Sequence, residues 1–121
     1  MKAEQNKTFV SLSNLQAISR GDPNRMLKYL NQFKELIPER LEQLKHALSK
    51  EDRKNIRQIV HKMSPQLQFF GIQDIIIPIQ RLEFEYETIP YFELESIIND
   101  IIYKLEGAMS EVSKIIKTQF E

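Results

Sequence analysis

The sequence predicts an all-α protein, specifically an antiparallel up-down-up-down four-helix bundle with a short N-terminal capping helix. Three observations lead to this prediction. Apolar residues recur at the i, i+3, i+4, i+7 spacing of amphipathic helices in every long segment. No segment shows convincing alternation of apolar and polar residues, which half-buried strands require. The expected connectors are short, so consecutive helices should run antiparallel.

Residues 1–8 are polar and predicted to be flexible, and residues 9–121 are expected to form one bundle domain. The segment 9–22 predicts a short helix, with Ser13 as its N-cap and Gly21 as its C-terminal stop. A long second helix is expected from Asp22 to about residue 50. Its apolar stripe consists of Leu27, Leu30, Phe33, Ile37, Leu41, Leu44 and Leu48. Pro38 lies inside it and predicts a kink, with a break into two helices as the alternative.

Three more helices are expected after the turn at residues 49–52. The first covers residues 55–71 and ends at Gly71; its stripe consists of Ile56, Ile59, Val60, Met63, Leu67 and Phe70. The second covers about 73–87, and Pro78 should distort its first turns. The third covers about 91–119. Its apolar residues alternate four and three apart, a spacing typical of bundle seams: Leu94, Ile98, Ile101, Leu105, Ala108, Val112 and Ile115.

The composition narrows the possible functions. A chain of 121 residues with 28% charged and 41% hydrophobic residues is typical of a single globular domain. A net charge of zero gives nucleic-acid binding no electrostatic support. The absence of cysteine excludes disulfides and thiolate chemistry and fits a reducing compartment. The longest apolar run, residues 75–79, is far too short to span a bilayer, and the opening residues lack a signal peptide's apolar core. We therefore expect a cytoplasmic protein, or the cytoplasmic part of a larger one.

His61 is the candidate functional residue, at the centre of the helix predicted for residues 55–71. At about 100° per residue its side chain points roughly 150° away from the apolar stripe, into solvent. Polar and basic side chains share this face: Lys54, Arg57, Ser64 and Gln68. An imidazole placed there is either an ordinary surface histidine or a group that reacts with a partner.

Other chemistries lack the residues they need. The second histidine, His46, falls on a different helix, and no histidine or carboxylate lies three or four positions from His61 to complete a metal pair. No nucleophile and orienting acid suggest a hydrolytic triad. The sequence also has no glycine-rich phosphate loop, so ATP binding is not expected.

The stretch VHKMSPQLQFFGI, preceded by a helix ending LEQLKHALSKED, resembles the histidine phosphotransfer (HPt) domains of bacterial two-component phosphorelays. The opening LSNLQAISRGDPNRMLKYLNQF is similar to the family's first helix, Gly-Asp turn and second helix, so the resemblance covers nearly the whole chain. His61 matches the phosphorylated histidine, and Gly71 matches the last glycine of the signature. Ser64 and Pro65 stand where lysine and glycine are usual. The His-Lys-Met-x-Pro variant is similar to HPt modules of hybrid sensor kinases.

A second family, the dimerisation helix of sensor kinases, is a poorer match. Its H-box reads histidine, acid, three residues and proline. Here Pro65 lies four positions after His61 rather than five, and Lys62 replaces the acid. No ATP-binding domain follows in this chain.

The HPt resemblance implies that His61 accepts a phosphoryl group from a receiver-domain aspartate and passes it to another receiver aspartate. The implied partner is a response-regulator receiver domain, possessing the divalent cation that the transfer needs; the chain itself would use no cofactor or metal. It would be a monomeric phosphocarrier without intrinsic ATP-dependent kinase activity, binding neither nucleic acid nor membrane. A membrane-bound hybrid sensor kinase is one possible source of such a cytoplasmic domain.

Neighbours of His61 are assigned two roles. Four should support the phosphoryl group through charge or hydrogen bonds: Arg57, Lys62, Ser64 and Gln68. Three should serve partner docking: Lys54, Pro65 and Gly71. Pro65 cannot donate to the carbonyl of His61, and a glycine at 71 leaves room for a partner. The alternative for each is an ordinary solvated side chain or a helix stop.

Two rival functions remain open. In one, the departures at Ser64 and Pro65 mark a non-catalytic HPt-like adaptor that docks receiver domains without phosphotransfer. In the other, the regular seam of the last helix mediates self-association of a structural bundle.

Overall fold

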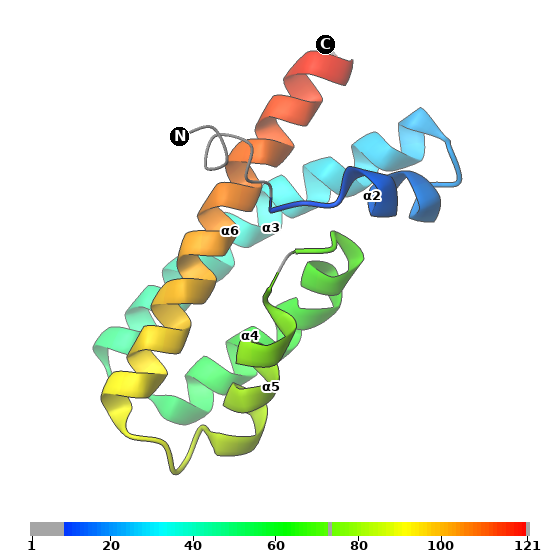
Figure 1. Ribbon diagram of the computed structural model, residues 1–121. Helices are drawn as coiled ribbons and strands as arrows, with labels where there is room; N and C mark the ends of the chain where they lie inside the picture. Colours follow the sequence, from blue (N-terminus) through cyan, green and yellow to red (C-terminus); the bar gives the residue numbers. More distant parts are fainter. Residues whose placement is uncertain (1–8, 73, 121) are drawn as a thin grey trace, which may run out of the picture.

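Helices joined by short turns, with no strand, make up the described residues 9–72 and 74–120 of a computed structural model (Figure 1). The all-α prediction is confirmed. These residues form five helices: α2 (Leu12–Ile18), α3 (Pro23–Ser49), α4 (Arg53–Phe69), α5 (Ile76–Glu85) and α6 (Tyr91–Phe120). The flexibility predicted for residues 1–8, the helix start predicted at residue 73, and residue 121 lie outside the described part.

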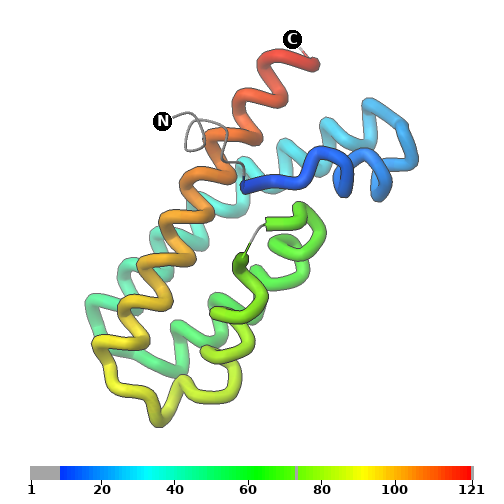
Figure 2. The backbone as a smooth tube through the Cα atoms, in the orientation of Figure 1, coloured from blue at the N-terminus to red at the C-terminus, as the bar shows by residue number. Residues whose placement is uncertain are grey.

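The long helices α3 and α6 run side by side, and α3 also packs against α4 (Figures 1 and 2). The shorter α5 packs against both α4 and α6, while α2 packs against α4. Helix α4 therefore contacts three other helices, and α3, α5 and α6 each contact two. No helix within the described ranges is long and apolar enough to cross a membrane.

One apolar stripe from each helix forms a continuous core. The stripe predicted for α4 is buried along its whole length, from Ile56 to Phe70. In α3 the middle of the stripe is buried as predicted, but its end residues Leu27 and Leu48 are only half-buried. Phe33 of α3 stacks on Phe70, with ring centroids 4.2 Å apart. Burial of such side chains, at about 1.5 to 3 kcal/mol each, is the main source of stability.

The start of α2 differs from the prediction. Ser11, rather than Ser13, is the N-cap: its Oγ accepts from the backbone N–H of Asn14 at 3.1 Å. Contacts with the end of α4 decide the position, because Ser11 N–H donates to the carbonyl of Phe70 and the Asn14 amide donates to that of Phe69. Ser13 is exposed inside the helix.

Pro38 and Pro78 lie within helices, as the sequence predicts. Pro38 lies inside α3, which continues as one helix, so the alternative of two helices is wrong. Pro78 is the third residue of α5, where a backbone N–H has no acceptor within the helix, so its ring is accommodated there. The observed α5 begins at Ile76 and ends at Glu85, and is therefore shorter than the predicted range.

Two side chains fix the connector between α5 and α6. Arg53, the first residue of α4, donates to the carbonyls of Tyr86 and Ile89 at 2.9 and 2.7 Å. The Tyr91 hydroxyl donates to the carbonyl of Leu48 at the end of α3. Burial raises the pKa of the Tyr91 phenol above its ordinary value, which favours the protonated form that donates this bond. The Arg53 bonds tie the end of α5 to the start of α4, and the Tyr91 bond ties the start of α6 to the end of α3.

Gly71 directly follows the C-cap of α4 and stops this helix, as predicted. Its N–H donates to the carbonyl of Gln68, and the next N–H, of Ile72, donates to Leu67, which is the Schellman pattern. Gly71 has a φ of +62°, and a Cβ there would lie 2.8 Å from the Cβ of Ser11. The glycine therefore serves both the left-handed turn and the close approach of α2.

We predict that Gly71→Ala destabilises the protein more than Gly21→Ala. Both glycines have a positive φ, which costs a side chain about 1 kcal/mol. A Cβ at Gly21 meets nothing within 4 Å, whereas one at Gly71 overlaps Ser11 and adds about 1 to 3 kcal/mol. Urea denaturation followed by circular dichroism measures both free energies of unfolding. Equal losses would show that the contact with α2 relaxes freely.

Candidate functional site: the His61 face of α4

His61 lies in the middle of α4 with 63% of its side chain exposed. The outward orientation predicted from the helical spacing is confirmed. The inner face of the same helix is buried, including the adjacent Val60. The packed backbone therefore presents the ring to solvent from a fixed position.

Glu83 of α5 contacts the imidazole, with its Oε2 2.7 Å from His61 Nδ1. An ionised carboxylate can only accept hydrogen bonds, so the Nδ1 of a neutral ring must carry the proton in this contact. Nε2 then retains its lone pair. Because Nε2 lies on the other side of the ring from Nδ1, it is directed away from Glu83. The arrangement can hold the exposed His61 ring in one tautomer, in which Nε2 is the nucleophilic nitrogen.

Arg57 holds the other oxygen of the same carboxylate, with its Nη2 3.0 Å from Glu83 Oε1. The Arg57 guanidinium also lies over the ring of Tyr86, 5.6 Å from its centroid. Its Nε is buried without a hydrogen-bond partner in the described part of the protein. Arg57 thus reaches His61 through Glu83, and the three side chains link α4 to α5.

The sequence reasoning missed Glu83. It lies 22 residues after His61, and the spacing within α4 carries no information about α5. A weak signal was present, because Glu83 follows Ile79 by four positions and Leu82 by one, next to the buried stripe of α5. Only the packing of α5 on α4 brings it to the imidazole.

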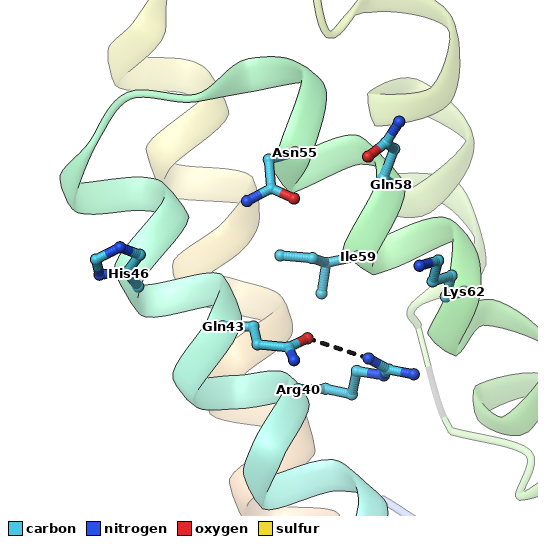
Figure 3. A pocket seen from close by; sticks show the side chains of 7 residues that line it. All are labelled: Arg40, Gln43, His46, Asn55, Gln58, Ile59 and Lys62. Atoms are coloured by element: carbon cyan, nitrogen blue, oxygen red, sulfur yellow. Dashed lines mark hydrogen bonds between the residues drawn. The ribbon is translucent and has the colours of Figure 1, made fainter.

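Of the phosphoryl-supporting candidates, Arg57 alone is joined to His61 by the contacts described. Gln68 donates to the Ser64 hydroxyl at 3.3 Å, one turn along α4. Lys62 lines a hollow between α3 and α4 (Figure 3). Their assignment to the phosphoryl group stays a prediction.

The docking candidates are spread along α4. Lys54 is exposed in its first turn, and Pro65 is exposed one turn after His61, beside the half-buried Phe69. Gly71 lies ten residues beyond His61, about 15 Å along a helix axis, and turns toward α2. Its local role in the fold is clear, while its role in docking stays a prediction.

No group of three or more histidine or acidic side chains in residues 9–72 and 74–120 could hold a metal ion. The His61 site contains one imidazole and one carboxylate, and the carboxylate is already paired with Arg57. These groups suit a nucleophile that is oriented by its neighbours.

We predict that Glu83→Ala changes the tautomer of His61. In the unaltered protein the neutral ring should carry its proton on Nδ1, whereas without the carboxylate it should shift toward the Nε2–H form preferred in water. Long-range ¹H–¹⁵N NMR at about pH 8, where histidines are mostly neutral, measures the tautomer. His46, exposed on α3, is the internal control and should not change. An Nε2–H ring in the unaltered protein would contradict the proposed orientation.

Comparisons with protein-family models, curated proteins and solved structures find no match to this chain. Its function is therefore inferred from the resemblance of the sequence around His61 and from the contacts of that side chain.

Proposed function

We propose that this protein is a histidine phosphotransfer domain that carries a phosphoryl group on His61. A receiver domain donates the group from an aspartyl phosphate, and a second receiver aspartate takes it. The single observation that carries this proposal is the exposed imidazole held at Nδ1 by Glu83, which leaves Nε2 directed outward. The packing of α3 to α6 is compatible with an up-down-up-down four-helix bundle capped by α2.

Nucleophilic attack by Nε2 accounts for the transfer. The Nε2 lone pair forms a bond to phosphorus while the bond from phosphorus to the aspartyl oxygen breaks, and the receiver's carboxylate leaves with that electron pair. The receiver supplies the divalent cation, and this chain supplies a positioned nucleophile. The reverse steps deliver the group to the next aspartate. The chain would thus act as a phosphocarrier, without kinase activity of its own.

Glu83 would also stabilise the product. Bond formation at Nε2 leaves the ring with a positive charge as long as Nδ1 keeps its proton. The carboxylate of Glu83 lies against that N–H and balances this charge. Arg57 in turn prevents the carboxylate from moving away, because it holds the opposite oxygen.

The adaptor function remains the alternative, and the residues at 64 and 65 favour it. The site has a serine and a proline where HPt domains usually have lysine and glycine. Gln68 donates to Ser64, so one of the two amide hydrogens of Gln68 is already in use. By contrast, the predicted seam of α6 is buried inside the protein from Leu94 to Val112, so these residues are not available for self-association.

We predict that incubation with a phosphorylated receiver domain labels the protein with an acid-labile, alkali-stable phosphate. His61→Gln should abolish the label completely, because glutamine has no nucleophilic nitrogen. His46→Gln, the matched control on α3, should retain it. Receiver binding without labelling would support the adaptor and overturn the phosphocarrier.

Glu83→Ala should slow transfer to His61 by about tenfold to a hundredfold, the cost of a poorly oriented nucleophile. Rapid-quench kinetics with saturating phosphorylated receiver measures this step. Glu87→Ala, which removes an exposed acid just beyond α5, is the control and should leave the rate unchanged. Circular dichroism verifies that both variants are folded. An unchanged rate in Glu83→Ala would remove the positioning role of the carboxylate.

A further inference from the structure

A polar hollow of about 340 Å³ lies between α3 and α4 (Figure 3). We call it the basic groove; it is lined by Arg40, Gln43 and His46 of α3 and by Asn55, Gln58, Ile59 and Lys62 of α4. Figure 3 shows the guanidinium of Arg40 and the Lys62 side chain at one end of the groove. Ile59 forms its apolar floor, since this side chain is buried.

The groove has cations but no carboxylate among its lining residues. Arg57, Arg81, Lys45 and Lys104 each form an ion pair, whereas neither Arg40 nor Lys62 has a carboxylate within 4.0 Å in the described ranges. Among the described residues, Arg40 donates only to the amide oxygen of Gln43, and its Nε is buried without a partner there. The guanidinium therefore has hydrogen-bonding capacity that the described part of the protein does not use.

Acidic residues border the basic groove on one side. Glu35 and Glu39 line the next hollow along α3, together with Gln66 of α4. The α3–α4 surface thus changes from acidic to basic over about two helical turns. A carboxylate-bearing partner would be attracted to one hollow and repelled from the other, which fixes where it can lie.

We propose that the basic groove docks an acidic segment of the protein that exchanges phosphoryl groups with His61. This inference rests on the proposed function for the identity of the partner. Lys62 adjoins His61 in the chain, and a standard interface of about 800 Å² per partner extends roughly 16 Å from its centre. A partner that docks over His61 therefore also reaches Lys62, which lines the groove. A carboxylate can accept two parallel hydrogen bonds from one guanidinium, so it suits the N–H donors of Arg40 that have no partner among the described residues.

The test is a titration of the ¹⁵N-labelled full chain with a short oligo-glutamate peptide, monitored by NMR. Inorganic phosphate and the corresponding oligo-glutamine peptide are titrated in parallel. We expect saturable shifts at Arg40, Asn55 and Lys62 with the glutamate peptide only, and weaker binding as salt rises from about 0.02 M to about 0.2 M. Equal binding of inorganic phosphate would show a small-oxyanion site, and shifts spread over all lysines would show non-specific attraction. Either result overturns the proposal.

Charge-changing variants localise the binding. Arg40→Gln and Lys62→Glu should each weaken the peptide about fivefold or more. Lys117→Glu, a matched change at an exposed position of α6, should have no effect. His61→Gln should also bind normally, so loss of phosphotransfer and loss of docking are separate outcomes. Unaltered binding in Lys62→Glu and Arg40→Gln would overturn the proposal, whatever the result at His61.

Discussion

The carboxylate of Glu83 is the contact on which the candidate site depends. One oxygen meets His61 Nδ1 and the other meets Arg57, so a single side chain of α5 joins two turns of α4. An exposed imidazole without such a partner would rotate and exchange its proton between two nitrogens. With it, an otherwise ordinary surface histidine presents one defined nitrogen to a partner.

That contact requires α5 to lie in register beside α4. Hydrogen bonds at the ends of the helices, away from His61, fix this register. Arg53 holds the connector after α5 through two carbonyls, and Tyr91 binds the end of α3. Beneath the site, Ile79 and Leu82 of α5 are buried in the core. An exposed ion pair contributes at most about 1 kcal/mol to the stability of the fold. Packing of α5 therefore places Glu83, and the ion pair forms because Glu83 is already there.

The two sides of α4 offer a partner different surfaces. One side carries the imidazole and its carboxylate, and the other carries the cations of the basic groove. Chemistry and recognition can therefore depend on different residues of one helix. Such a separation lets association respond to charge and salt while the reacting nitrogen keeps its geometry.

The sequence by itself determined the helices, their buried stripes and the outward direction of His61, because each follows from spacing within one helix. It also identified Gly71 as a helix stop from its local chemistry. The cap at Ser11 and the partner of His61 were decided only by tertiary structure. Each depends on a neighbouring helix or on packing along the whole element. The spacing within a helix determines which face a residue occupies, but only packing between helices determines which side chain lies opposite.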